Sequence, residues 1–233
     1  MFSSFTGIWW IRADGSGQPQ QLLETKGRSG LPTSFTPDGR TLAYFQARAG
    51  TGFDILTLPL DTSDSDHPKP GKPAPFLRTD KDELYPAFSP DGRWLAYDSN
   101  ESGTHEIFVR PFPGGEAPSG SGAGGKWQIS AGGGRFPLWS RNGKELFYET
   151  ADGCIMVAEY TANGDSFVPG KARQWSDKRI FVTGAVRNYD LAPDGKRLAV
   201  FPLPEAANGD KASVHVTVLV NFFDYLRQRL PVK

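Results

Sequence analysis

The sequence has little cysteine, little histidine and no excess of charge of either sign, and each shortage excludes a class of protein. One residue in 233, Cys154, is a cysteine, so the chain has no intrachain disulfide framework and no metal site built from several thiolates. Lys and Arg number 26, as do Asp and Glu, so the basic surface that neutralises a phosphate backbone is missing. We therefore expect no nucleic-acid partner.

Long apolar runs are also missing. The longest one near the end, residues 214–223, is interrupted by polar residues such as His215 and Asn221. It is far shorter than the roughly 20 residues of a membrane-spanning helix, so we expect no membrane insertion by this chain. Residues 1–6 lack the basic and apolar regions of a secretory signal.

Glycine and proline, in contrast, are abundant. They number 27 and 19, about a fifth of the chain, which argues against a helical bundle. Hydrophobic residues make up 38% of the sequence and aromatic residues 12%, so the chain can form one large core.

One motif recurs four times at nearly constant spacing. The sequence FTPDGR at residues 35–40 returns as FSPDGR at 88–93, WSRNGK at 139–144 and LAPDGK at 191–196. The Asp or Asn positions are 53, 51 and 52 residues apart. Proline presets φ, Asp or Asn bonds its own backbone, and glycine accepts a positive φ. Each copy therefore predicts a hairpin turn.

Strand-length segments follow each turn. The second strands are expected at residues 41–44, 94–97, 145–148 and 197–200, and the third at 54–58, 106–109, 154–157 and 214–218. Weaker fourth strands are expected at 75–77, 126–129 and 178–181. Tandem four-stranded antiparallel units without helices predict an all-β protein, a β-propeller. A β-sandwich is the alternative, but a period of about 50 residues is too long for its hairpins.

These repeats predict one propeller domain, residues 1–233, with about four to five blades. The repeats span residues 31–79, 84–130, 135–181 and 187–220, after a partial blade at 7–25 and before a short helix at 221–230. In the partial blade, residues 8–11 and 20–23 are expected as the third and fourth strands. The chain forms either an incomplete ring with unusual closure or, as we favour, a fragment of a propeller with six or more blades.

At these turns the sequence resembles the TolB-like, WD-repeat-like propellers with Pro-Asp-Gly repeats, although it has no Trp-Asp dipeptide. Residues 135–148, 152–157 and 218–226 are similar to propellers that follow bacterial serine/threonine protein kinase domains. The resemblance implies a sensor or protein-interaction domain, often next to a kinase domain and a membrane anchor. The kinase signatures H-R-D and D-F-G are absent from this chain.

We interpret the chain as a non-catalytic module, not an enzyme, that binds a protein, peptide or small ligand through its loop-bearing rim. One version of this role is the sensor part of a bacterial signalling kinase. An accessory propeller that gates a prolyl-oligopeptidase-like hydrolase is an alternative, because the repeat also resembles those propellers. A fragment that forms a homodimer through open blade edges is another. The compartment stays open: periplasmic or extracytoplasmic if an upstream anchor or signal is missing, and otherwise cytoplasmic.

Motifs that carry chemistry are weak. The stretch 120–125 fits G-x-G-x-x-G, but Trp127 stands where a P-loop needs a hydroxyl, and no strand and helix flank it. The three histidines, His67, His105 and His215, lie in different repeats without metal-ligand spacing. We therefore expect no catalytic residue, no metal and no cofactor, and a flexible link at the glycine-rich stretch.

The turn carboxylates Asp38, Asp91 and Asp194 could be imagined as calcium ligands. A single Asp before Gly lacks the alternating oxygen ligands of a calcium loop, so we interpret these residues as turn caps.

The rim opposite the Pro-Asp-Gly turns is the expected binding surface. Loops on a rigid scaffold concentrate recognition residues, and solvated loop charges are the alternative interpretation. Five polar residues near the starts of the innermost strands are the candidate ligand-binding residues: Arg28, Glu83, Arg135, Arg187 and Asn188.

Overall fold

The computed structural model describes residues 1–4, 6–14, 16–49, 52–64, 66–113, 125–164 and 166–200. This part of the chain contains nineteen strands and no α-helix, which confirms the all-β prediction. It therefore offers no helix that could cross a membrane. The expected strand at 214–218, the helix at 221–230, His215 and most of the glycine-rich stretch lie outside the described residues.

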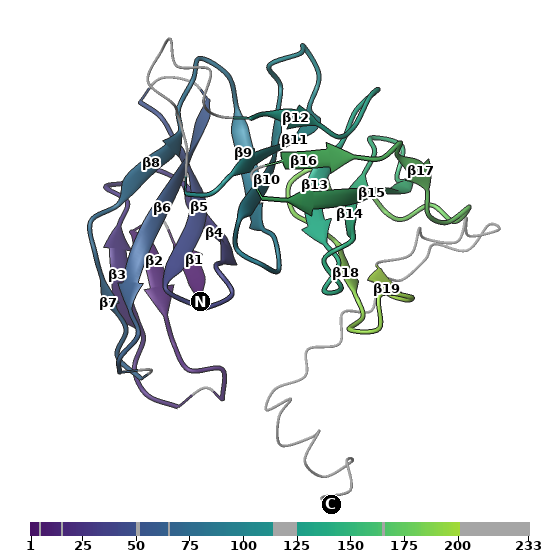
Figure 1. Ribbon diagram of the computed structural model, residues 1–233. Helices are drawn as coiled ribbons and strands as arrows, with labels where there is room; N and C mark the ends of the chain where they lie inside the picture. The colour runs from purple at the N-terminus through teal and green to yellow at the C-terminus, as the bar shows by residue number, and fades with distance from the viewer. Residues whose placement is uncertain are drawn as a thin grey trace, which may run out of the picture.

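The strands form five antiparallel sheets in chain order, which we call blades I to V (Figure 1). Blade I contains β1 (Phe2–Ser4), β2 (Gly7–Trp10) and β3 (Gln20–Glu24). Blade II contains β4 (Gly30–Phe35), β5 (Thr41–Ala47), β6 (Phe53–Asp61), β7 (Lys69–Pro70) and β8 (Ala74–Leu77). Blade III contains β9 (Glu83–Phe88), β10 (Trp94–Ser99), β11 (Glu106–Pro111) and β12 (Trp127–Gln128). Blade IV contains β13 (Arg135–Trp139), β14 (Glu145–Glu149), β15 (Ile155–Asn163), β16 (Ser166–Pro169) and β17 (Arg173–Gln174). Blade V contains β18 (Tyr189–Leu191) and β19 (Leu198–Val200).

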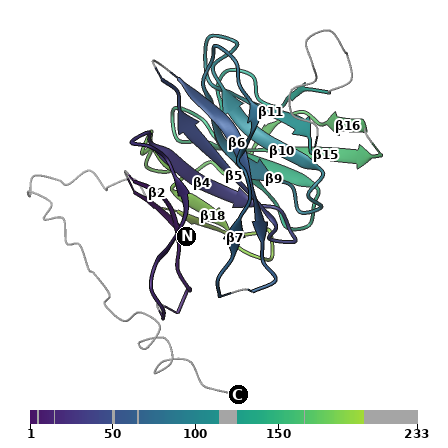
Figure 2. The same cartoon turned by 90° about the vertical axis from the view of Figure 1, so that its left-hand side faces the viewer.

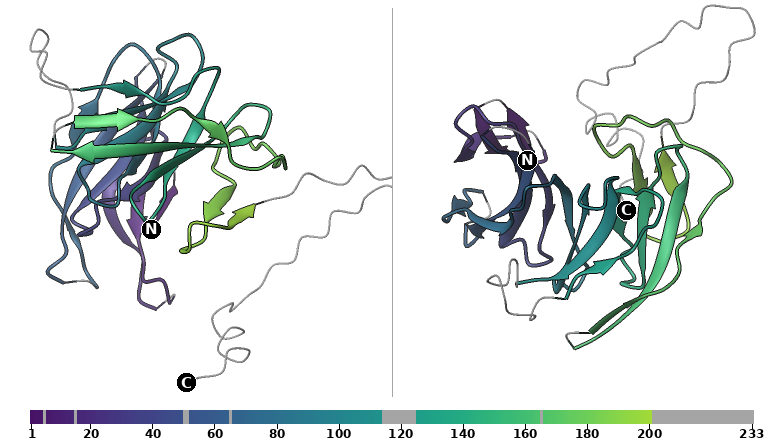
Figure 3. Two further views of the ribbon diagram at one scale, coloured as in Figure 1. Left: turned by 45° about the vertical axis from the view of Figure 1, so that its right-hand side comes forward. Right: turned by 90° about the horizontal axis from the view of Figure 1, so that it is seen from above.

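The blades follow one another along an open arc, from the purple strands of blade I to the yellow-green strands of blade V (Figure 3). Seen from the side of blades I and II, the twisted sheets lie one behind another (Figure 2). Within the described residues no strand joins blade I to blade V. The arrangement is that of an incomplete β-propeller.

Alternating side chains on the second strand of each blade hold the arc together. In β5, Leu42 and Tyr44 are buried against blade I, whereas Ala43 and Phe45 are buried against blade III. Strands β10 and β14 repeat this pattern toward their own neighbours. Successive residues of a strand point to opposite faces, so both faces of each sheet are apolar and both require a neighbour.

The Pro-Asp-Gly turns have the geometry that the sequence predicts. In all four turns the Asp or Asn Oδ1 accepts a hydrogen bond from the backbone N–H two residues later, at 2.9–3.1 Å. The glycine that follows has φ between 67° and 71° in every copy, a conformation that costs glycine little. The side chains concerned are those of Asp38, Asp91, Asn142 and Asp194.

The prediction of a fourth strand at 178–181 is wrong. Strand β15 pairs instead with β17, and within 178–181 Ile180 donates one backbone hydrogen bond, to Gly153 O at 2.9 Å. The cause is the ribbon of β15 and β16, which returns the chain beside β15 five residues early. Gly170 N–H marks this return by donating to Glu159 O at 2.7 Å. Strands β1, β7 and β16 were not predicted.

The β15–β16 ribbon reaches back over blade III. Phe167, which is 2% exposed, lies 5.1 Å from Trp94 and 5.5 Å from Trp127 between ring centroids. Arg93 Nη1 donates to Gly164 O near the ribbon tip at 3.1 Å. The neighbouring residue Val168 points to the other face and is 56% exposed.

We predict that Phe167→Ala lowers the free energy of unfolding by about 3–5 kcal/mol, because it opens a cavity among buried rings. Urea unfolding of the purified chain measures the change. Val168→Ala on the same strand is the matched control and is expected to stay within about 0.5 kcal/mol of wild type. Equal losses for the two variants would contradict the packing of the ribbon on blade III.

Candidate functional site

A cleft lies where the innermost strands β4, β9 and β13 face the axis of the arc. We call it the inner cleft. It has a volume of about 210 Å³ and is lined by residues 31–33, 85–87, 136–137 and 186–187. Three adjacent blades and the segment before blade V therefore contribute to a single hollow.

The inner strands are irregular at this cleft. Each has a break in its register with the second strand of its blade, between residues 32 and 34 in β4 and opposite residues 96–98 for β9. Tyr85 and Phe136 occupy equivalent bulge positions and have φ of 51° and 58°. Such left-handed backbone costs an aromatic residue about 1–3 kcal/mol and is concentrated at functional sites.

Aromatic rings connect the blades around the cleft. Tyr85 lies edge-on to Phe45 of blade II at 4.8 Å and to Phe136 of blade IV at 4.5 Å. Its hydroxyl donates to the carbonyl of Ala185, and the hydroxyl of Tyr189 donates to Phe136 O at 2.6 Å. Residues 183–187 are thus tied across the cleft to blade III.

Arg135 is held by several partners on its blade and the neighbouring one. Its guanidinium carbon lies 5.5 Å from the Tyr85 ring centre and 5.0 Å from that of Phe136. Nη1 donates to Gly184 O at 2.8 Å, and Nε lies 3.6 Å from Asp98 Oδ2. These contacts tie residues 183–187 to blades III and IV.

Asp98 is fully buried behind Arg135. Its Oδ2 lies 2.8 Å from His105 Nδ1. Burial raises the pKa of the Asp98 carboxyl above its ordinary value, while His105 and Arg135 act in the opposite direction. The Asp98–His105 contact connects β10 with the start of β11, and no hydroxyl or thiol nucleophile of the described residues completes it into a catalytic triad.

Glu149 is a second buried carboxyl, at the equivalent position of blade IV. Glu149 is 2% exposed, and neither of its carboxyl oxygens has a hydrogen-bond partner among the described residues. Burial raises its pKa from 4.5 to about 7, although Arg135 acts to lower it. Arg135 is its cross-strand partner in β13.

The five candidate rim residues have different environments. Glu83 is 1% exposed and accepts a hydrogen bond from the Thr79 hydroxyl, and Asn188 is 5% exposed and donates to Phe181 O. Arg28 is exposed and does not line the inner cleft.

Arg187 is exposed and lines the cleft. It has no hydrogen bond or ion pair with another described residue. The sequence analysis did not select the aromatic wall, although Tyr-Pro at 85–86 and Phe-Pro at 136–137 are a repeated signal.

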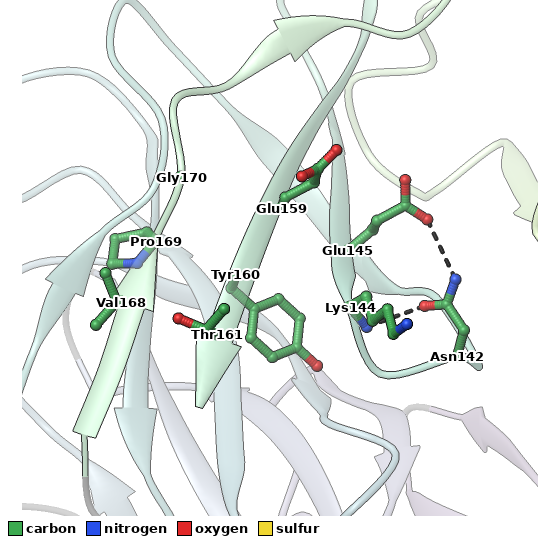
Figure 4. A pocket seen from close by; sticks show the side chains of 9 residues that line it. All are labelled: Asn142, Lys144, Glu145, Glu159, Tyr160, Thr161, Val168, Pro169 and Gly170. Atoms are coloured by element: carbon green, nitrogen blue, oxygen red, sulfur yellow. Dashed lines mark hydrogen bonds between the residues drawn. The ribbon is translucent and has the colours of Figure 1, made fainter. Parts of the chain in front are cut away.

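A larger hollow of about 690 Å³ lies on the outer part of blade IV, between β14 and the β15–β16 ribbon (Figure 4). Glu145 and Glu159 face each other across β14 and β15 and point to the same side (Figure 4). In blade III the position of Glu145 is held by Trp94, which packs under Phe167 of the next blade. This hollow therefore corresponds to an inter-blade face.

No group of three or more His, Cys, Asp or Glu side chains within the described ranges is arranged to hold a metal ion. Cys154 is buried and is a free cysteine.

An arc of antiparallel blades, four of them with a Pro-Asp-Gly or Arg-Asn-Gly turn between the first two strands, defines the fold as a TolB-like β-propeller. A solved structure with this fold is that of a protein described as TolB from Agrobacterium tumefaciens, at 19% identity and a TM-score of 0.50, with 71% of this chain and 56% of that chain covered. A second is a puromycin-hydrolysing peptidase of Mycobacterium tuberculosis, at 18% identity and a TM-score of 0.51, with 80% and 30% covered.

This chain therefore spans about half or less of the length of these proteins. No protein-family model and no curated protein matches it. At such identities the likeness concerns the fold, and the link to kinases stays a prediction.

We predict that Glu149→Gln removes a pH dependence of stability. The folded chain binds the Glu149 proton more tightly than the unfolded chain, so stability from this group is lost as the pH rises from 4.5 through about 7. The melting temperature of the variant relative to wild type should therefore rise between about pH 5 and pH 8, by the equivalent of about 1–3 kcal/mol. Glu145→Gln, at a half-buried position of the same strand, should show no such trend. A pH-independent difference for Glu149→Gln would contradict the raised pKa.

Proposed function

We propose that this chain is a non-catalytic binding module whose inner cleft receives part of a protein or peptide ligand. The observation that carries the proposal is the cleft itself, which three adjacent inner strands form together with Arg187, a residue without an ion pair to another described residue. Clefts in which elements of several blades meet on a rigid scaffold are preferred places for recognition.

The chemistry of the lining supports binding rather than catalysis. Residues 31–33, 85–87, 136–137 and 186–187 include no His, Cys, Asp, Glu or Lys. The hydroxyl of Thr33 donates to Pro86 O at 2.6 Å, and that of Tyr85 donates to Ala185 O. No pair of nucleophile and base therefore lies in the cleft.

The size and stiffness of the cleft favour a side chain as its occupant. Its volume of about 210 Å³ lies below the roughly 300–1,000 Å³ of pockets for drug-sized ligands. Three prolines stiffen its walls, Pro32, Pro86 and Pro137, and a preorganised wall lowers the entropy cost of binding. One or two side chains of a larger ligand fit here while the rest of the ligand lies across the rim. The sensor part of a signalling kinase and the gate of a hydrolase are two predicted contexts for such a module.

We predict that Val186→Trp weakens ligand binding at least about tenfold, because the indole fills the mouth of the cleft. Random peptides displayed on phage would be selected on wild-type protein and then measured by fluorescence anisotropy. The matched control is Val168→Trp, since Val186 is 52% and Val168 is 56% exposed. Both variants should melt as wild type does. If every selected peptide binds Val186→Trp and wild type equally, the cleft is not the binding site.

Self-association is the second candidate function, favoured by the state of blade I. Strand β1 is bonded only to β2 among the described strands. Phe2 is 42% exposed and stacks on Trp9 with ring centroids 6.5 Å apart. Trp9 alternates with Ile8, which is buried toward blade II, so this aromatic pair lies on the opposite face, against which no other described blade packs. A second copy of the chain would cover that face and edge.

We predict that wild type shows a dimer by light scattering at high concentration and that Phe2→Lys shifts it to monomer, because a charge replaces the exposed apolar ring. Phe35→Lys is the matched control, since Phe35 is also 42% exposed but lies at the Pro-Asp-Gly end of β4. A wild-type monomer at all concentrations would exclude self-association through blade I.

A further inference from the structure

We infer that the group bound in the inner cleft is a carboxylate with an apolar side chain beside it, as at the C-terminus of a peptide. This inference rests on the proposed binding function and adds the chemical class of the ligand. It follows from Arg187, a lining residue with no hydrogen bond or ion pair to another described residue, from the prolines and engaged hydroxyls of the walls and from the volume of the cleft.

The charge is that of Arg187. Arg135 is not a lining residue, and it is engaged by Gly184 O, Asp98 and two rings. Arg187 lines the cleft, and its guanidinium has no hydrogen-bond or ion-pair partner in the described part of the chain. A guanidinium beside apolar walls attracts a planar anion more strongly than one in bulk water, and it can bind a carboxylate through two hydrogen bonds.

The walls offer no charged group that could bind an anion in place of Arg187. Pro32, Pro86 and Pro137 lie on the inner strands at the cleft, and proline has no backbone N–H to donate. The other residues of the inner strands at the cleft are Leu31, Thr33, Tyr85, Ala87 and Phe136, and the hydroxyls of Thr33 and Tyr85 already donate to backbone carbonyls. A carboxylate must therefore meet the guanidinium, while the wall accepts an apolar side chain.

The residues that would contact the apolar side chain and the carboxylate are adjacent. Val186 and Arg187 are neighbours in the chain, and their Cα atoms are therefore about 3.8 Å apart. A carboxylate and an apolar side chain on the same ligand residue, or on neighbouring residues, match this spacing. A C-terminal apolar residue carries both groups. An internal Asp or Glu beside an apolar residue presents the same chemistry, and the experiment separates the two sources.

Three fluorescein-labelled peptides test the inference by anisotropy: Gly-Ser-Gly-Ser-Leu as the free acid, the same peptide as its C-terminal amide, and Gly-Ser-Asp-Leu-Gly-Ser amide. We expect the free acid to bind wild type about tenfold more tightly than the amide, with the preference weakening in high salt. If the internal Asp peptide binds as tightly as the free acid, the shared chemistry stands and its source is a side chain.

Two substitutions assign the preference to the cleft. Arg187→Gln should reduce binding of the free acid to that of the amide and leave the amide unchanged. Val186→Asp should do the same by placing a negative charge at the mouth. Their matched controls are Lys196→Gln, at an exposed turn of the same blade, and Val168→Asp, and both should keep the wild-type preference.

Equal binding of acid and amide to wild type, a preference that survives Arg187→Gln, or no binding of any probe up to about 1 mM would overturn the inference. Failure of the proposed function gives a different result. In that case no phage-selected peptide is sensitive to Val186→Trp. If selected peptides depend on Val186 but not on a carboxylate, the binding module stands and only the ligand class is overturned.

Discussion

The structure depends on one constraint: the second strand of a blade has apolar side chains on both faces. In β10, Leu95 and Tyr97 are buried toward blade II, and Trp94 and Ala96 toward blade IV. A sheet with two apolar faces exposes one of them unless a neighbour covers each side. The blades are thus mutually dependent, and the chain is stable as an array rather than as five separate sheets.

The same alternation fails at one repeated position, and the failure occurs at the inner cleft. The position seven residues after the turn Asp or Asn is held by Phe45 in blade II, Asp98 in blade III and Glu149 in blade IV. Phe45 lies edge-on to Tyr85, whereas the two acids are buried with raised pKa values. Polar burial against the local pattern is a common mark of a functional or strained region. The left-handed bulges at Tyr85 and Phe136 lie at the same end of the sheets.

The sequence could predict the turns and the strands beside them because both are local. Pro, Asp and Gly determine the backbone of the turn whatever surrounds it, so the repeat alone located most first and second strands. The ribbon of β15 and β16 depends on a distant contact, the packing of Phe167 on Trp94, which no local pattern contains. Because the sequence does not reveal this ribbon, residues 178–181 were expected to form the fourth strand of the blade.

The candidate rim was harder to predict because residue type does not give burial. Glu83 has the charge of a surface residue, yet it is buried and its pKa is raised to about 7. The cleft is built mainly from aromatic and proline residues, which the sequence presents as ordinary strand and turn residues. These residues line the cleft because bulges in the inner strands change the local backbone there, and the sequence pattern does not show the bulges.

Arg135 and Arg187 illustrate how one repeated position serves two roles. They are 52 residues apart, which is the spacing of the turns that follow them. Arg135 lies beside the Asp98 carboxyl of the preceding blade, and the equivalent acid for Arg187 is Glu149. Burial raises the pKa of the Glu149 carboxyl to about 7, so Glu149 depends less on a neighbouring cation than an ordinary carboxylate does. Arg187 has no hydrogen bond or ion pair with another described residue, so its guanidinium can meet an anion that comes from outside the chain.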